Sequence, residues 1–165
     1  MKTTLFLLFT LILTSCLKYQ EPKLLSLSGE YIIESVIVHD ENFTTEIMNL
    51  KTGDIFTNTL EIPQIDTINL GTTKWSFDYS TFYVLPIENV NGTTTYSEQY
   101  FYNTFGQNYF DDLGYIDIFI GNKILTFKII NDGTESLGLR SKSELYLNGE
   151  ITKVNITYKL TRIGP

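Results

Sequence analysis

Hydrophobic and polar residues alternate along most of this chain, and short clusters of turn residues interrupt the alternation. A period of two sends successive side chains to opposite faces of an extended backbone, so each alternating run predicts a half-buried β-strand. The pattern predicts strands at residues 29–39, 43–50, 55–62, 65–70, 74–79, 81–87, 94–102, 115–120, 123–130, 136–147 and 151–163.

Three clusters of turn residues are the clearest in the chain: Gly121-Asn122, Asn131-Asp132-Gly133 and Asn148-Gly149. Asn-Gly between two alternating runs is the strongest short-range signal for a hairpin, because a type I′ turn needs positive φ at both central residues. These turns predict a C-terminal meander of four long antiparallel strands. Residues 103–114 are the best candidate for a long loop.

The composition agrees with an all-β fold. The chain has no alanine, but it has 22 threonines, 19 isoleucines, 11 tyrosines and 11 phenylalanines. Alanine favours helices, whereas β-branched and aromatic residues favour strands. Many antiparallel strands joined by tight turns leave edges that closure into a barrel removes. We therefore expect an antiparallel up-and-down barrel of about eight strands, with a two-sheet β-sandwich as the alternative.

The N-terminus has the features of an export signal. Lys2 precedes an apolar run from Leu5 to Leu13, and small residues follow before Cys16. A membrane-spanning helix needs roughly 20 apolar residues, and Lys18 ends this run too early. Leu13-Thr14-Ser15-Cys16 resembles a lipobox, in which the cysteine receives lipid and becomes the new N-terminus. We expect a signal peptide at 1–15, a lipidated cysteine and tether at 16–27, and one domain at 28–165.

This N-terminus also predicts the partner and the location. Acyl chains such as palmitate on Cys16 would anchor the protein to a membrane. Leu17 follows the cysteine in place of the aspartate that signals inner-membrane retention in enterobacteria. We therefore expect the outer membrane and leave open the periplasmic or the surface face. Cys16 is the only cysteine, so the mature chain has no internal disulfide.

The net charge excludes one class of partner. The whole chain carries −7, and loss of Lys2 with the signal peptide leaves −8, from 11 basic and 19 acidic residues. An acidic domain repels the phosphates of nucleic acids, so no nucleic acid partner is expected. The acidic residues are spread along the chain, and solubility explains them.

The two ends of the predicted domain resemble a known family. The first strand opens Leu27-Ser28-Gly29-Glu30-Tyr31-Ile32-Ile33, and the last ends Tyr158-Lys159-Leu160-Thr161-Arg162-Ile163. This is similar to the small lipocalin-like lipoproteins of Bacteroides-type bacteria. In that family a Gly-x-Trp begins the first strand, and a late arginine packs across the aromatic ring and closes the barrel. The resemblance implies that role for Gly29, Tyr31 and Arg162, with tyrosine in place of tryptophan.

Catalytic chemistry has little support in the sequence. His39 is the only histidine, and no Gly-x-Ser-x-Gly motif occurs. Asp111, Asp112 and Asp117 lack the spacing of a calcium loop, and a zinc site has no ligand set. We expect no enzyme activity, no metal and no cofactor.

The densest aromatic segment is the best candidate for a ligand site. Tyr96, Tyr100 and Tyr102 alternate on one face of a predicted strand, and Phe105 and Tyr109 follow in the predicted loop. Rings with polar tips suit a small apolar molecule or a glycan at a barrel mouth. Cross-strand aromatic pairing within the core is the alternative. The function expected is a non-enzymatic binding module, and the alternative is a structural or protein-interaction lipoprotein with a filled barrel.

Overall fold

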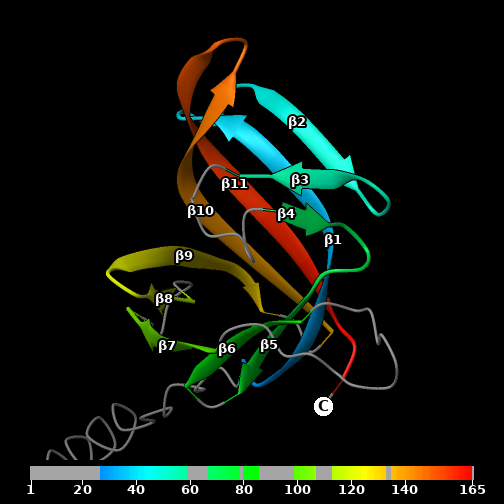
Figure 1. Cartoon of the computed structure of the whole chain (residues 1–165), viewed down its shortest axis with the longest axis vertical. Coiled ribbons are helices and arrows are strands. Elements are labelled where there is room, and N and C mark those ends of the chain that lie inside the picture. Colours follow the sequence, from blue (N-terminus) through cyan, green and yellow to red (C-terminus); the bar gives the residue numbers. More distant parts are fainter. Residues whose placement is uncertain are drawn as a thin grey trace, which may run out of the picture.

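The computed structural model describes residues 27–58, 67–78, 80–85, 99–106, 113–132 and 135–164. Regular secondary structure within these ranges consists of β-strands (Figure 1). They are β1 (Gly29–Asp40), β2 (Glu46–Lys51), β3 (Ile55–Thr57), β4 (Thr67–Asn69), β5 (Lys74–Asp78), β6 (Thr81–Leu85), β7 (Gln99–Phe105), β8 (Tyr115–Ile120), β9 (Lys123–Asp132), β10 (Ser136–Leu147) and β11 (Glu150–Arg162). None of these ranges contains a helix of the length and apolarity that crossing a membrane requires.

The main sheet closes on itself. Its strands are ordered β11-β10-β9-β8-β7-β6-β5-β1-β2, and β11 also pairs with β1. This last pairing closes an antiparallel barrel of eight strands, with β2 as one extra strand. The expected barrel is confirmed, and its architecture is consistent with a lipocalin-like fold. The β1–β11 pairing joins the two edges that a two-sheet sandwich would leave apart.

One edge of β1 is shared by two strands. Residues 29–32 pair with β5, and residues 35–39 pair with β2, while β11 occupies the opposite edge. The chain leaves this shared edge after β2 and returns to it with β5. Between the two it forms the β3–β4 hairpin, which lies beside the upper halves of β1 and β11 (Figure 1).

The interior of the barrel is filled by large side chains. Phe56 and Ile68, from the β3–β4 hairpin, are each 1% exposed. The ring of Phe56 lies 6.3 Å from the ring of Tyr158, and Trp75 lies 5.4 Å from the same ring. Trp75 also contacts Phe82 and Phe127 at 5.5 and 5.8 Å. Such contacts are those of a close-packed protein core, and Phe56 and Ile68 of the hairpin are part of it.

The C-terminal meander of four antiparallel strands is confirmed as β8, β9, β10 and β11. Leu147 pairs with Glu150, and the two residues between them, Asn148 and Gly149, have φ of 52° and 92°. Positive φ at both central positions is the signature of the predicted type I′ turn.

The turn predicted at Asn131-Asp132-Gly133 is wrong in its position. Asn131 and Asp132 belong to β9 and pair with Gly138 and Leu137 of β10. β9 therefore extends into the predicted turn, and its register with β10 shifts between Gly138 and Leu139. Similarly, the predicted loop at 103–114 begins later, because β7 extends to Phe105.

Candidate functional site

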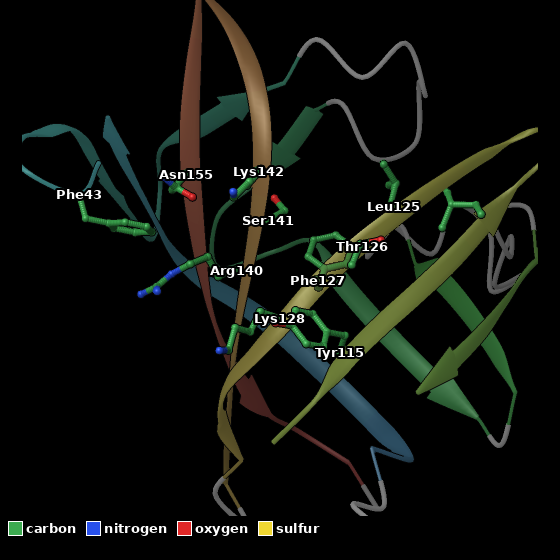
Figure 2. A pocket seen from close by; sticks show the side chains of 11 residues that line it. Phe43, Tyr115, Leu125, Thr126, Phe127, Lys128, Arg140, Ser141, Lys142 and Asn155 are labelled. Carbon is green, nitrogen blue, oxygen red and sulfur yellow. The ribbon is translucent and has the colours of Figure 1, made fainter. Parts of the chain in front are cut away.

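β9 and β10 separate part-way along their length. They pair from Leu137 and Asp132 as far as Arg140 and Lys128. Beyond this rung, the described part of β9 pairs only with β8 and that of β10 only with β11. A cleft of about 480 Å³ lies where they diverge (Figure 2). Its lining consists of Phe43, Tyr115, Ile124, Leu125, Thr126, Phe127, Lys128, Arg140, Ser141, Lys142 and Asn155.

A row of side chains crosses the outer face at the narrow end of this cleft. The register places Phe105, Tyr115, Lys128, Arg140 and Thr157 opposite one another on five successive strands. Phe105 stacks on Tyr115 at 5.4 Å, and Lys128 Nζ lies 5.7 Å from the Tyr115 ring centroid. Arg140 Nε donates a 3.4 Å hydrogen bond to Thr157 Oγ1. Tyr115 thus packs against Lys128, and Thr157 orients the Arg140 guanidinium.

The turn between β1 and β2 adds an aromatic ring to the site. The Phe43 ring lies 4.4 Å from the guanidinium carbon of Arg140. Phe43 has φ of 58°, in the left-handed region that a bulky side chain disfavours. Asp40 stabilises this turn, because its Oδ1 accepts hydrogen bonds from the amides of Thr44 and Thr45 at 2.6 and 2.9 Å. Asn155 Nδ2, buried beneath the turn, donates to the carbonyl of Asp40 at 3.0 Å.

The Asp40 carboxylate is more acidic than usual. Its side-chain hydrogen bond with Thr44 and its backbone hydrogen bond with Thr45 lower its pKa, because both favour the ionised form. The charge of Asp40 is therefore used to hold the turn, and Asp40 does not line the cleft. These hydrogen bonds fix the conformation of the turn.

The charge of the cleft is opposite to that of the chain. Lys128, Arg140 and Lys142 line it, and none of its described lining residues is acidic. The whole chain, by contrast, has 19 acidic and 12 basic residues. Three cations gathered around one concavity raise the local concentration of anions.

The floor of the cleft reaches the barrel core. Leu125 and Phe127 point inward from β9, and Phe127 is 2% exposed. Ser141 points inward from β10 and hydrogen bonds with the hydroxyl of the buried Tyr158. Burial raises the pKa of Tyr158, and the hydrogen bonds with Ser141 and Asn58 offset part of that increase. The cleft thus combines an apolar floor with a cationic rim.

No family model, curated protein or solved structure matches this chain.

The aromatic residues predicted to bind a ligand are not all brought together. Tyr100 and Tyr102 are 6% and 8% exposed and point into the core, where Tyr102 lies 5.3 Å from Phe77. Burial raises the pKa of Tyr102, and the charge of Asp78 raises it further. Phe105 has the opposite parity on β7, so it lies on the outer face and is 44% exposed. Tyr96 and Tyr109 lie outside the described residues.

The three residues implied to close the barrel do lie together. Tyr31 pairs with Arg162 across β1 and β11, and the Arg162 guanidinium carbon lies 5.7 Å from the Tyr31 ring centroid. Arg162 Nη2 donates to the carbonyl of Ser28. A Cβ atom on Gly29 would lie 2.7 Å from Arg162 Nε, so only glycine leaves room for this guanidinium. Tyr31 and Arg162 thus meet where β1 and β11 pair.

Other candidate groups have structural partners or fall outside the described residues. Asp117 accepts a 2.6 Å hydrogen bond from the hydroxyl of Thr126. The ring of His39 lies 5.5 Å from the ring of Phe43, at a tilt of 42°. Within the described ranges, no three histidine, cysteine, aspartate or glutamate side chains gather to hold a metal. Cys16, Asp111 and Asp112 lie outside those ranges.

Proposed function

We propose that this chain is a lipid-anchored protein of the bacterial envelope, and that its barrel is a non-enzymatic binding module. The cleft between β9 and β10 is the binding site in this proposal. Its volume of about 480 Å³ lies within the range of roughly 300–1,000 Å³ that small-molecule sites occupy. An apolar floor with a few polar groups at the rim is also the usual composition of such sites.

The observation that carries this proposal is the separation of β9 and β10 beyond the Lys128–Arg140 rung. A closed barrel has its strands paired along their length, and an interrupted pairing exposes backbone groups as well as core side chains. The interior offers less room, because Trp75, Phe127 and Tyr158 are in mutual ring contact there. We therefore propose a ligand site in the wall of the barrel and not in its interior.

Binding at the cleft is tested by a substitution that fills the cleft with a large side chain. Thr126→Trp places a large ring on an exposed position of the cleft lining, whereas Lys159→Trp places the same ring on an exposed position of β11 outside the lining. Small amphiphiles should bind the parent and the Lys159 variant, as measured by isothermal titration calorimetry, and not the Thr126 variant. Equal binding by all three proteins would contradict the proposal.

The anchoring part of the proposal rests on the lipobox sequence that ends at Cys16. Cys16→Ser should prevent labelling by radioactive palmitate and leave the protein unprocessed or released from the membrane fraction. Normal labelling of that variant would show that lipid is attached elsewhere. Protease treatment of whole cells then distinguishes a surface location from a periplasmic one in the proposed outer membrane.

A second function is favoured by an exposed apolar row. Phe101, Phe119 and Ile124 are paired in register across β7, β8 and β9 and are 66%, 40% and 57% exposed. Adjacent exposed apolar side chains are typical of protein contact surfaces. In this second function the barrel interior is filled by side chains, and the exposed row on the outer face binds another envelope protein. A photo-crosslinker at Phe101 should then give one specific adduct in intact cells, and a crosslinker at Lys51 should not.

A further inference from the structure

The rung that ends the pairing of β9 and β10 opposes two positive charges. Lys128 and Arg140 are direct cross-strand partners. Like charges placed directly opposite each other in a sheet are destabilising. Lys142 adds a third cation two residues further along the same face of β10. An anion bound beside this rung would make favourable contacts with these cations.

The contacts of Arg140 orient it without neutralising it. Its guanidinium packs on the Phe43 ring at 4.4 Å, and its Nε donates to the Thr157 hydroxyl at 3.4 Å. Within the described part of the chain, Arg140 and Lys142 form no ion pair. A guanidinium has five N–H donors in a planar fork, so donors remain for the oxygens of an acidic group.

The position of Phe43 shows that the site is preorganised. Its left-handed backbone, with φ of 58°, is a strained conformation for a phenylalanine. Two hydrogen bonds to Asp40 and one from Asn155 hold the turn in this form. Strained residues of this kind persist where the surroundings over-determine them, and they cluster at ligand sites.

The remaining surface of the cleft is apolar. Ile124 is 57% exposed at its rim, while Leu125 is partly buried and Phe127 is fully buried at its floor. Contact with these side chains would remove apolar surface of a ligand from water, at a gain of roughly 25 cal/mol per Å². Figure 2 shows Arg140 and Phe43 on one side of β10, with Leu125 and Phe127 toward β9.

We propose that the cleft binds an amphipathic anion with a carboxylate head group and an alkyl body. The carboxylate lies between Arg140 and Lys142 with Lys128 facing it, and the alkyl body lies against Leu125 and Phe127. This inference rests on the proposed function, since it names the ligand of the same cleft. It specifies that the head group of the ligand is negatively charged and that the rest of the ligand is apolar.

The test compares three amphiphiles with the same twelve-carbon chain, each below its micelle-forming concentration. Dodecanoate is the anion, dodecyl maltoside is neutral and dodecyltrimethylammonium is the cation. Isothermal titration calorimetry on the mature chain from Cys16 should show dodecanoate binding at least about tenfold more tightly than the neutral amphiphile, as expected for a charge-assisted contact. The cation should not bind.

Variants then assign the site. Lys142→Gln and Arg140→Gln should each weaken dodecanoate binding about tenfold and leave dodecyl maltoside binding unchanged. Lys51→Gln, an exposed cation of β2 outside the lining, is the matched control and should have no effect. Lys142 is exposed, so its variant should keep the melting temperature of the parent even if Arg140→Gln unfolds part of the turn.

The outcomes separate this inference from the proposed function. If all three head groups bind equally and Leu125→Asp removes all binding, the cleft binds apolar molecules and the anion inference is wrong. If dodecanoate binds but neither Lys142→Gln nor Arg140→Gln weakens it, the inference is also wrong. If no amphiphile binds the parent, both the inference and the proposed binding function fail.

Discussion

Lys128 and Arg140 face each other across β9 and β10 at the last rung before the strands separate. Lys128→Glu would convert this like-charge pair into an opposite-charge pair. We expect the free energy of unfolding to rise by about 0.5 kcal/mol, measured by urea denaturation, while dodecanoate binding is lost. Lys123→Glu, at the far end of β9, is the control. A variant that is both less stable and still able to bind would contradict the assignment.

Phe43 combines backbone strain with a ring-to-guanidinium contact. Phe43→Asn should relieve the strain, because asparagine tolerates the left-handed conformation. We expect the free energy of unfolding to stay the same or to rise by up to about 1 kcal/mol, because the lost ring contact offsets part of the gain. Dodecanoate affinity should fall, because Arg140 loses the ring that positions it. Unchanged affinity would mean that the strained turn has no part in binding.

The turn that carries Phe43 should respond to acid. The hydrogen bonds of Asp40 with Thr44 and Thr45 hold its pKa below the ordinary value of 3.8. Because the folded pKa is lowered, the stabilisation is fully present above 3.8 and is lost as the pH falls through the folded value. The amide signals of Thr44 and Thr45 in NMR spectra should move together below pH 3.8. In Asp40→Asn this transition should be absent, and a transition that persists would contradict the assignment.

Gly29 makes room for the guanidinium of Arg162. A Cβ atom at Gly29 would meet Arg162 Nε at 2.7 Å, whereas one at Gly164 would meet only Glu30 atoms at 3.7 Å or more. Gly29→Ala should therefore lower the free energy of unfolding by about 1–3 kcal/mol, and Gly164→Ala should change it little. Equal effects of the two substitutions in urea denaturation would show that the contact of Arg162 with the β1 strand start is not needed.

The barrel could be predicted from the sequence because hydrophobic and polar residues alternate along its strands and turn-forming residues stand between them. Positive φ at Asn148 and Gly149 follows from residue types that tolerate it, so the β10–β11 hairpin and its register were predictable. The inward parity of Tyr100 and Tyr102 could also be read from the alternation. The alternation does not show whether such a face surrounds a ligand or packs into a core. The interior is filled by the β3–β4 hairpin, which comes from a distant part of the chain.

The cationic cleft was not predicted from the sequence, and the reason is strand register. A turn at Asn131-Asp132-Gly133 would place Lys128 opposite Ser136, whereas the structure places it opposite Arg140. The pairing through Asp132 and the irregularity at Gly138 shift the register, and a shift changes every cross-strand neighbour. The contact of Phe43 with Arg140 is likewise non-local, since Phe43 lies in the turn between β1 and β2 and Arg140 lies in β10, far away in the chain.

The most direct test of the account is a map of the binding site. Dodecanoate should be titrated into the isotopically labelled mature chain, and backbone amide shifts should be followed by NMR spectroscopy. The largest shifts should lie at residues 124–128, 140–142 and Phe43, around the cleft between β9 and β10. Shifts concentrated instead around Phe82, Tyr100 and Tyr102, inside the barrel, would contradict this expectation.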